Sequence, residues 1–470
     1  MGIDLLLSLR QELAVTLIIF LLLFLKVGAT TYRNETILTL VNVLLCLNFV
    51  SGFFMNTAST QFGGMFHTGP LVTLEKNILN LGTLIGSLQA YDWLKRHPQV
   101  PEFYMLLLST LVGLFFMISA GNLLMFYLGL ELSTIPLAAL SSFDLEKPKS
   151  SEAAMKFIMS SAFSSALLLF GISLVYGITG TLGFDSLGAH LGGSPLALFA
   201  FLLLLSGFAF KISVVPFHLW TADVYEGSPV AVTAYLSVIS KGAVFFVLIQ
   251  VLYTVFKPLA GSWYQVLVGL SILTMFIGNL FALRQDNLKR LLAFSSIAQV
   301  GFILVGITGS TQAATASVVY FLLIYIFSNL GAFGVVSLVS AQTGKETIPD
   351  YRGLYQTNPF LSWVLAISLF SLAGIPPTAG FFGKFFLLMA GAARGNYIFI
   401  GLAALNMVIS LYYYLRVIKA IFMDPNEHPL EKLHVPLLPN IGLLVCMAGV
   451  LITGFVGGIY DYIYSLSTGF

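Results

Sequence analysis

Apolar runs long enough to cross a lipid bilayer recur along almost the whole 470-residue chain. A spanning helix needs about 20 apolar residues, because each residue adds about 1.5 Å and hydrocarbon offers the backbone no hydrogen bonds. The predicted spans, about fourteen in number, cover residues 10–26, 37–55, 70–92, 102–119, 121–142, 152–176, 195–217, 228–255, 262–283, 290–309, 312–341, 359–392, 396–423 and 436–459. The sequence therefore predicts an all-α polytopic membrane protein.

The composition excludes a water-soluble domain. Apolar residues make up 58% of the chain and charged residues only 9%, whereas soluble proteins carry about 25% charged residues. The net charge is +2 and no basic cluster occurs, so we expect the lipid bilayer and no nucleic acid as partner. The cysteines, Cys46 and Cys446, lie far apart and the six histidines are scattered. We therefore expect no metal or redox cofactor in this chain.

The basic residues predict an orientation in the membrane. Loops after odd-numbered spans, with the adjoining span ends, hold fourteen lysines and arginines, and the opposite side holds only Arg10, Lys257 and Arg394. Because cytoplasmic loops are enriched in lysine and arginine, odd-numbered loops are predicted to be cytoplasmic. We expect a multi-pass membrane protein with both termini on the outer side.

Two spans contain helix-breaking residues. Residues 195–217 contain Pro216, and residues 359–392 contain glycine and two prolines between positions 374 and 377. The second run is too long for one straight crossing, so we expect one broken helix. Broken spans 7 and 12 are five spans apart, which is typical of two inverted five-helix repeats, here spans 4–8 and 9–13. A single membrane domain, 1–470, is expected to comprise an N-terminal three-helix segment, two repeats and a C-terminal helix, at residues 1–100, 101–255, 261–423 and 436–470.

Four charged residues lie deep within apolar runs: Glu131, Lys211, Lys241 and Lys384. A charge at bilayer depth costs about 2.5 kcal/mol or more, so such residues usually serve transport. Burial favours the neutral amine and a nearby carboxylate favours the ammonium, which makes a lysine–carboxylate pair a switchable proton site. A purely structural ion pair has the same sequence signature.

Other titratable residues lie nearer the ends of spans. Glu75 and Lys76 are about six residues into the third span, where the lysine can reach the headgroups. Lys156 is similarly close to an end. His218 follows Pro216 in a predicted loop, where it serves either as a proton relay or as a structural hydrogen bonder.

Several motifs resemble the antiporter-like subunits of respiratory complex I, the proton-pumping NADH:quinone oxidoreductase of bacteria. The similarity covers most of residues 120–420, while the first hundred residues agree mainly in hydropathy. The matching segments are Phe210–Lys211, Val215–Pro229, Leu283–Ala298, Ala373–Pro377, Phe382–Lys384 and Tyr412–Arg416. Within the family, the form of Asp223–Gly227 is most similar to the N type of subunit.

The resemblance implies a proton path. Glu131 would pair with Lys211, Lys241 would be the central relay and Lys384 the terminal site, while His218 and Lys156 are further candidates. The resemblance also implies NADH, FMN, iron–sulfur clusters and quinone in sister subunits, and it implies other antiporter-like and small membrane subunits as partners. Proton transfer in this chain would then be coupled to redox chemistry elsewhere.

One position departs from the family pattern. Gln299 stands where histidine is expected after Ser295–Ala298. Glutamine can form hydrogen bonds but cannot hold an extra proton at neutral pH, so the path between Lys241 and Lys384 is predicted to use water or another side chain. The lysine at position 384 resembles the N and L types of subunit, whereas the M type usually has glutamate at this position. The chain also stops without the long lateral helix of the L type.

Two other functions share these sequence features. A subunit of a multisubunit cation/proton antiporter would also have broken helices and buried lysines. A scaffold subunit would use the same charges only to hold helices together. Co-extraction of this chain with redox subunits would distinguish a complex I subunit from a cation/proton antiporter subunit. Titration of Lys241 would distinguish a proton relay from a scaffold.

Overall fold

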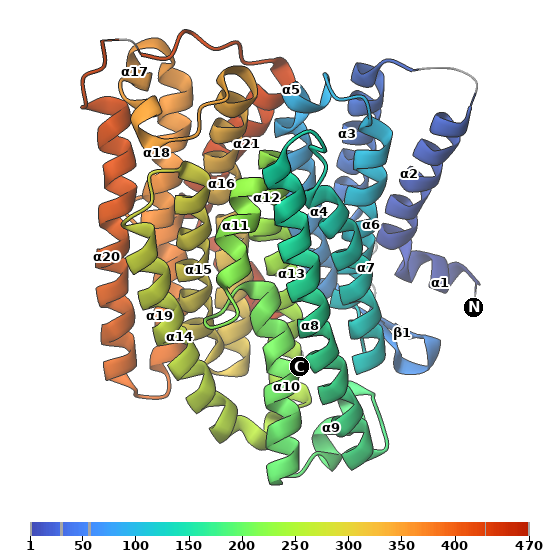
Figure 1. Ribbon diagram of the computed structural model, residues 1–470. Helices are drawn as coiled ribbons and strands as arrows, with labels where there is room; N and C mark the ends of the chain where they lie inside the picture. Colours follow the sequence, from blue (N-terminus) through green and yellow to red (C-terminus); the bar gives the residue numbers. More distant parts are fainter. Residues whose placement is uncertain (1, 29–31, 55–57, 428, 469–470) are drawn as a thin grey trace.

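The computed structural model describes residues 2–28, 32–54, 58–427 and 429–468, which form a bundle of long helices (Figure 1). The only sheet in that part of the chain is an antiparallel hairpin of β1 (Ser59–Gln61) and β2 (Phe66–Thr68), with Thr60 opposite His67. The structure confirms the predicted all-α class.

The helices follow the predicted order along the chain. The N-terminal segment consists of α1 (Gly2–Ser8), α2 (Arg10–Val27), α3 (Asn34–Ser51), the 3₁₀ turn η1 (Phe62–Gly64), α4 (Pro70–Gln89) and α5 (Tyr91–Leu94). The next part consists of α6 (Val100–Ile118), α7 (Leu123–Ser141), α8 (Pro148–Thr179), α9 (Phe184–His190), α10 (Pro195–Ile212), α11 (Leu219–Gly227), α12 (Val230–Tyr235), the π-helix η2 (Leu236–Ser240) and α13 (Lys241–Thr254). The last part consists of η3 (Lys257–Leu259), α14 (Ala260–Ala282), α15 (Leu288–Ile307), α16 (Thr311–Thr343), η4 (Ile348–Tyr351), α17 (Leu354–Thr357), α18 (Pro359–Ala373), α19 (Ala379–Ala392), α20 (Tyr397–Phe422), α21 (Leu437–Phe455) and α22 (Gly458–Leu466).

Eleven of the described helices are long and apolar enough to cross a membrane, fewer than the predicted fourteen. The difference has a physical basis in three places. The predicted first span is α2, which carries Arg10, Glu12 and Lys26. The predicted third span is α4, which carries Glu75 and Lys76 together with several polar residues. The predicted twelfth span is divided into α18 and α19, each too short to cross alone.

The two halves of the bundle pack in the same manner. Helix α6 lies along α7 in the first half, and α14 lies along α15 in the second. Both pairs approach closely at glycine: a Cβ on Gly113 would lie 2.5 Å from the Ser133 nitrogen, and one on Gly278 would lie 2.6 Å from the Ala298 nitrogen. Helix α8 packs on α10 and α11, as α16 packs on α18 and α19. Small residues at these crossings allow close backbone packing without a hydrophobic driving force.

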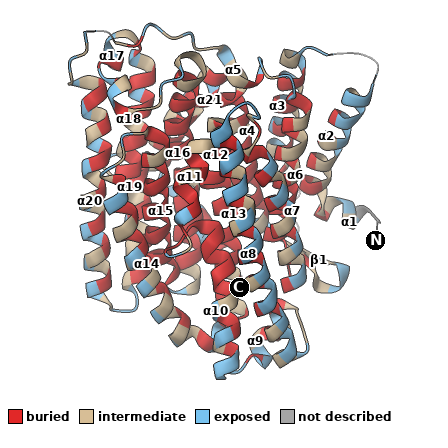
Figure 2. Cartoon of the chain, viewed as in Figure 1, coloured by how far each residue is buried: buried red, intermediate tan, exposed pale blue. Residues whose placement is uncertain are grey.

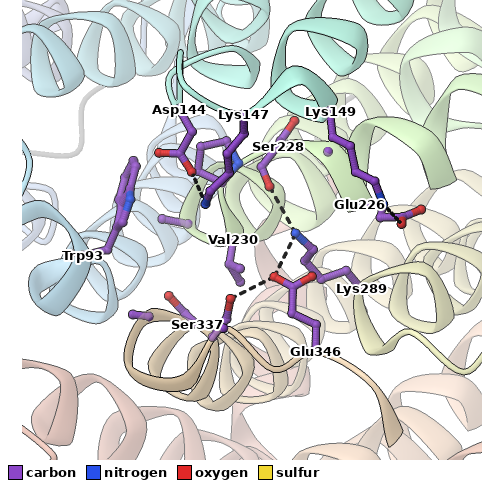
Figure 3. Close-up of a pocket in the computed structure, with 16 residues that line it drawn as sticks. Trp93, Asp144, Lys147, Lys149, Glu226, Ser228, Val230, Lys289, Ser337 and Glu346 are labelled. Atoms are coloured by element: carbon purple, nitrogen blue, oxygen red, sulfur yellow. Dashed lines mark hydrogen bonds and ion pairs between the residues drawn. The ribbon is translucent and has the colours of Figure 1, made fainter.

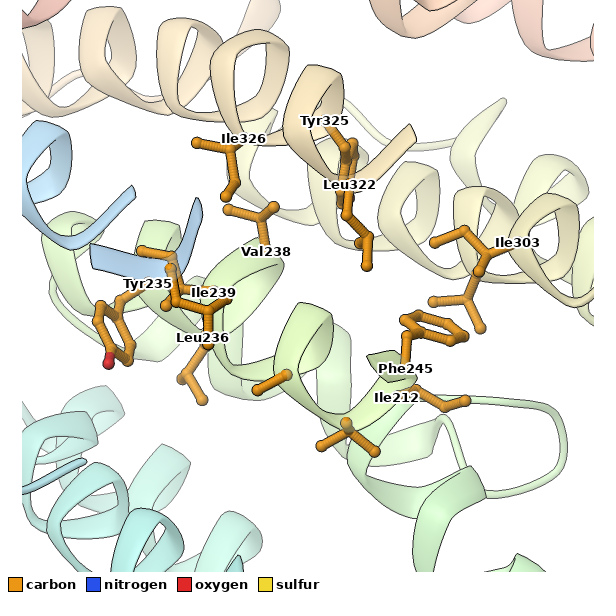
Figure 4. Close-up of a cluster of buried hydrophobic side chains, with 14 of the residues drawn as sticks. Ile212, Tyr235, Leu236, Val238, Ile239, Phe245, Ile303, Leu322, Tyr325 and Ile326 are labelled. Carbon is orange, nitrogen blue, oxygen red and sulfur yellow. The ribbon is translucent and has the colours of Figure 1, made fainter. Parts of the chain in front are cut away.

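The buried core lies at the centre of the bundle, while the outer helices expose one face (Figure 2). The segment 230–254, α15 and α16 are almost entirely buried, whereas the buried share is only 33% in α3 and α20 and 39% in α14. Figure 4 shows apolar side chains of this centre, with Val238 facing Ile326 and Phe245 facing Ile303. This centre includes the helix that carries Lys241, whereas α10 and α19, which carry Lys211 and Lys384, keep an exposed outer face.

Both predicted helix breaks are present. Helix α10 ends at Ile212, Ser213 is left-handed with φ 65°, and the Val215–Pro216 peptide bond is cis. Helix α18 ends at Ala373, Gly374 is left-handed with φ 83°, and the Pro376–Pro377 bond is cis. The two breaks share an ordered backbone pattern in different helices.

Two details differ from the sequence prediction. The predicted loop after Pro216 is mostly the helix α11, because Trp220, Val224 and Tyr225 supply a buried apolar face. The predicted eighth span is also interrupted, since the π-helix η2 lies directly before Lys241. No proline or glycine marks this irregularity, and π-helical turns occur frequently at functional sites.

Candidate functional site

Three lysines lie deep within the bundle, on helices far apart in sequence. The exposed fractions are 8% for Lys211, 2% for Lys241 and 1% for Lys384. None of the three ammonium groups makes an ion pair with a carboxylate of the described residues. Uncharged oxygen atoms hold all three groups, so their charge is not neutralised by direct pairing.

Lys211 is the last but one residue of α10 and contacts hydroxyls of two other helices. Its Nζ donates to Thr134 Oγ1 on α7 at 2.5 Å and to Ser161 Oγ on α8 at 2.9 Å. It also lies 5.7 Å from the ring centroids of Phe157 and Phe210. Hydrogen bonds and aromatic faces together offset part of the cost of burying the ammonium.

The predicted direct pair between Glu131 and Lys211 is not formed. Glu131 on α7 is only partly buried, and its carboxylate accepts a hydrogen bond of 2.5 Å from Ser165 on α8. Ser161 and Ser165 are four residues apart and therefore lie on one face of α8. Ser165 binds the Glu131 carboxylate, and Ser161, one turn away, binds the Lys211 ammonium. The two charges therefore do not touch.

Lys241 is the first residue of α13, immediately after the π-helix η2. Its Nζ donates to Ser296 Oγ on α15 at 2.8 Å and lies 5.3 Å from the ring centroid of Tyr225. Ser237, one turn earlier, accepts a hydrogen bond of 2.9 Å from Asn329 Nδ2 on α16. The π-helix thus directs polar groups toward both α15 and α16 at the centre of the bundle.

Lys384 on α19 binds the backbone that the second break leaves open. Its Nζ donates to the carbonyl oxygen of Leu372 at 2.7 Å and to that of Ala373 at 3.3 Å. It also lies 4.8 Å from the ring centroid of Phe302. Carbonyls at a helix end in a membrane need a buried or aqueous partner, and here the lysine itself supplies one.

A chain of hydrogen bonds leads from the terminal lysine back to α15. Gln299 Nε2 donates to the Leu372 carbonyl at 2.9 Å and to the Tyr414 hydroxyl at 3.1 Å. The Tyr414 hydroxyl lies 2.5 Å from Ser295 Oγ. Ser295 precedes Ser296, the partner of Lys241. Lys241 and Lys384 are therefore linked through α15 and α20, apart from the step between the two serines.

Sequence reasoning did not assign a role to Tyr414. Residues 412–416 were used only for the family resemblance, although the burial of the three tyrosines differs sharply: Tyr412 is 64% exposed and Tyr414 is fully buried. The sequence holds a signal for the inward face, because Asn406, Ser410 and Tyr414 recur every four residues and all three are buried. Only the packing of α20 reveals this contact.

Lys156 and His218 occupy different environments from the three buried amines. The Lys156 side chain is 42% exposed and pairs with Glu152 and Asp223, each at 2.7 Å. His218 is 8% exposed, follows the first break, and its Nδ1 makes no hydrogen bond within the described residues. Lys156 is thus part of a surface ion-pair group, while His218 lies inside.

The predicted cytoplasmic side holds a polar cavity of about 400 Å³ (Figure 3). Within it, Lys289 Nζ lies 3.2 Å from Glu346 Oε1, and Lys149 Nζ lies 3.0 Å from Glu226 Oε1. The cavity wall includes Val230, the first residue of α12, which leads toward Lys241. Charged walls and this position suit an aqueous inlet.

The N-terminal helices contain an ion pair that the sequence did not predict. Lys76, whose side chain could have reached the headgroups, is instead buried: its Nζ lies 2.5 Å from Glu12 Oε1, and both side chains are 2% exposed. Beside this pair, Gln11 Nε2 donates to Asn77 Oδ1 at 2.7 Å. Glu75 is 4% exposed. The bundle can bury Lys76 because α2 supplies a carboxylate at the same depth.

Metal ligands do not cluster in the described parts of the chain. No group of three or more His, Cys, Asp or Glu residues there is placed to hold a metal ion. Cys446 is buried and accepts a hydrogen bond from Gln89 at 3.5 Å, and Cys46 is exposed. The titratable groups described above thus form the candidate site.

Comparisons with known proteins agree on one family. Residues 120–410 match the family described as NADH:quinone oxidoreductase/Mrp antiporter, TM. A protein of Phocaeicola vulgatus named NADH-quinone oxidoreductase subunit N is 46% identical over 98% of both chains. Another of that name, from Moorella thermoacetica, is 40% identical over 87% of this chain and 86% of its own.

Solved structures give the same result for the fold. A chain of respiratory complex I from Thermus thermophilus with bound aureothin matches with a TM-score of 0.82 and 28% identity, over 98% of this chain and 100% of that one. A chain of the Mrp complex from Dietzia sp. matches with a TM-score of 0.85 and 20% identity, over 98% of this chain and 97% of that one. At that identity the second match concerns the fold alone.

Proposed function

The chain belongs to the NADH:quinone oxidoreductase/Mrp antiporter membrane family, and we propose that it works as subunit N, the proton-translocating antiporter-like membrane subunit of an NADH:quinone oxidoreductase. One observation carries the mechanism: Lys211, Lys241 and Lys384 are buried and held by hydroxyl or carbonyl oxygens. Such partners accept a hydrogen bond from an ammonium or from a neutral amine. Each lysine can therefore gain or lose a proton without leaving a buried group unpaired.

Proton transfer begins on the cytoplasmic side in this proposal. The charged cavity beside Val230 supplies water, and the π-helix η2 lies between this inlet and Lys241. Glu131 controls Lys211 by moving between its contact with Ser165 and direct contact with the ammonium. Lys384 receives the proton from Lys241 and releases it on the opposite side. His218 is a further relay beside the first break, and Lys156 belongs to the cytoplasmic rim.

The redox chemistry belongs to other subunits of the complex. NADH is oxidised and quinone reduced there, with FMN and iron–sulfur clusters as carriers. Neighbouring antiporter-like and small membrane subunits transmit the coupling by shifting the Glu131–Lys211 equilibrium, because an effector must favour one state over the other to move it. The identities of 46% and 40% to subunits named N favour this function over a cation/proton antiporter subunit.

In this function the chain crosses the membrane fourteen times. To the eleven apolar helices this topology adds α2, α4 and the broken pair α18 and α19. The two inverted repeats then cover α6 to α13 and α14 to α20, after the N-terminal segment and before the C-terminal helix α21. The similar packing of the two halves supports this division. Both termini lie on the outer side of the bacterial inner membrane.

Replacing Lys211 with alanine tests the function. The purified complex carrying Lys211→Ala should assemble normally, because the lysine makes no ion pair with described residues. In proteoliposomes, the number of protons moved per NADH oxidised should fall, since the amine beside Glu131 is lost.

The matched control is Lys257→Ala, which removes a lysine from the loop region at η3. Its ratio of protons to NADH should match that of the unmodified complex. A normal ratio in the assembled Lys211→Ala complex would contradict the proposal. Failure to co-purify with flavin and iron–sulfur subunits would instead favour the cation/proton antiporter.

A further inference from the structure

The hydrogen-bonded cluster between α15 and α20 lies where the family pattern leads us to expect a histidine. The cluster is closed to solvent: the exposed fractions of Ser295, Gln299 and Tyr414 are 2%, 1% and 0%. Ser295 and Gln299 are four residues apart and lie on one face of α15. Tyr414 contacts both of them from α20. The position therefore keeps a connected polar group despite the loss of an ionisable side chain.

We propose that the Tyr414 hydroxyl conducts protons between the central and terminal lysines, in place of the ionisable side chain missing at position 299. Gln299 is a positioning residue in this path, because its amide holds Tyr414 against the carbonyl that also binds Lys384. This inference rests on the proposed function of the chain. The inference adds Tyr414 and a proton route between Lys241 and Lys384, which the buried lysines alone do not define.

The orphaned oxygen of Gln299 identifies a place for water in this route. Its Oε1 is buried and makes no hydrogen bond with any described residue. An unpaired buried acceptor costs about 1–3 kcal/mol, and a water molecule that donates to it removes that cost. A water at this oxygen is next to the Gln299 amide nitrogen, which donates to the Tyr414 hydroxyl and the Leu372 carbonyl. The oxygen atom of the water can accept a proton from Tyr414. We assign this position to a bound water between Tyr414 and Lys384.

The transfer requires no oxidant and changes no bond to carbon. The oxygen of the Tyr414 hydroxyl accepts a proton from the Ser295 side while its original hydrogen passes to the water at Gln299. The water passes a hydrogen in turn to the neutral amine of Lys384, which becomes an ammonium. Lys241 on the other side loses the proton that entered the chain, so protons balance at every step.

One step of the route is not a direct hydrogen bond. The hydroxyls of Ser295 and Ser296 belong to consecutive residues, and within the described residues no bond joins them. Rotation of a serine hydroxyl exchanges donor and acceptor directions at little cost, because its hydrogen is free to turn.

The test is Tyr414→Phe in the intact complex, reconstituted into vesicles. Phenylalanine keeps the ring, whose centroid lies 4.5 Å from that of Tyr413, and removes only the hydroxyl. We expect protons moved per NADH to fall as far as in Lys384→Ala. We also expect proton transfer to become more sensitive to D₂O, since a longer water path replaces the hydroxyl.

Two other tyrosines provide matched controls. Tyr412→Phe makes the same chemical change on a side chain of α20 that is 64% exposed. Tyr320→Phe removes a buried hydroxyl on α16 that donates to the Thr453 carbonyl at 2.8 Å, outside the route. Both variants should keep the normal proton ratio. An equal loss in Tyr320→Phe would mean that removal of any buried hydroxyl explains the result, and the relay would be wrong.

A rescue experiment separates conduction from structure. Gln299→His restores an ionisable group to the path, so adding it to Tyr414→Phe should recover most of the proton ratio. If Tyr414→Phe does not assemble, Ser295→Ala removes the hydroxyl that contacts Tyr414 and should lower the ratio in the same way. A normal ratio in Tyr414→Phe or Ser295→Ala overturns the relay.

The failure of the relay and the failure of the proposed function give different results. If Lys384→Ala lowers the ratio but Tyr414→Phe does not, the lysine path stands and the tyrosine route is wrong. If Lys384→Ala also leaves the ratio unchanged, this chain does not conduct protons through Lys384, and the proposed function is wrong in that respect.

Discussion

The three lysines Lys211, Lys241 and Lys384 contact oxygen atoms that accept hydrogen bonds in either protonation state. Hydroxyls hold Lys211 and Lys241, and backbone carbonyls hold Lys384. Direct pairing with a carboxylate would stabilise the ammonium and oppose release of the proton. In the proposed function, the separation of Glu131 from Lys211 by the α8 serines leaves the amine free to exchange its proton.

Gly374 allows the terminal lysine to reach its carbonyl partners. Its φ of 83° is left-handed, and a Cβ there would lie 3.2 Å from Lys384 Cδ. Gly374→Ala should cost about 1–2 kcal/mol in backbone energy and displace the lysine. We expect a lower thermal midpoint of the purified complex and fewer protons moved per NADH.

Gly401→Ala is the matched control on α20, because open space surrounds a Cβ at this helical position. It should leave both the thermal midpoint and the proton ratio unchanged. If Gly374→Ala behaves in the same way, the left-handed glycine does not set the geometry of Lys384.

Some irregularities of single helices could be predicted from the sequence, and others could not. Proline and glycine predicted the breaks after α10 and α18, because both residues disfavour continuous helix. The π-helix before Lys241 has the ordinary residues Leu236–Ser240 and was not predicted. In the same way, nothing in α4 alone indicated that Lys76 meets Glu12 on another helix.

The pair of Glu12 and Lys76 should stabilise the N-terminal segment only while both charges are present. Glu12→Gln leaves a buried ammonium without its carboxylate, and breaking such a pair costs about 3–5 kcal/mol. Glu12→Gln should lower the thermal midpoint of the complex, whereas the double variant Glu12→Gln with Lys76→Met should recover most of the loss.

The comparison pair is Lys26 and Glu102, at 2.5 Å but with side chains 49% and 31% exposed. Exposed pairs contribute about 0–1 kcal/mol, so Glu102→Gln should change the midpoint little. Equal effects of Glu12→Gln and Glu102→Gln would show that burial does not govern the pair in α2 and α4.

Across the whole molecule, a charged contact joins the two halves at the predicted cytoplasmic side. Arg290, at the start of α15, donates through Nη1 to Asp223 at 2.9 Å and to Glu226 at 2.8 Å on α11. The same carboxylates bind Lys156 and Lys149 from α8. The two broken-helix systems are therefore linked beside the polar cavity.

Loss of Arg290 should loosen this link. Arg290→Gln removes the positive charge shared by two carboxylates, and for a partly exposed contact we expect a cost of about 1 kcal/mol. The thermal midpoint should fall slightly at low ionic strength, and the difference should shrink in concentrated salt because screening weakens the original contact.

Arg284→Gln provides the control, because Arg284 is an exposed residue of the same region. Its midpoint should stay close to that of the unmodified complex at both salt concentrations. A fall in Arg290→Gln that does not depend on salt would indicate a packing effect and contradict the electrostatic link.

The sequence by itself determined the environment, the helical class, both broken helices and the buried lysines, because these depend on composition, on the length of apolar runs and on residues that cannot continue a helix. The tertiary structure alone decided the partners of those lysines: Ser161 rather than Glu131 for Lys211, and a chain through Tyr414 toward Lys384. Partners on distant helices follow from how each helix is rotated in the bundle. In α20 the recurring Asn406, Ser410 and Tyr414 indicate which face turns inward, but only packing decides which side chains of α15 this face meets.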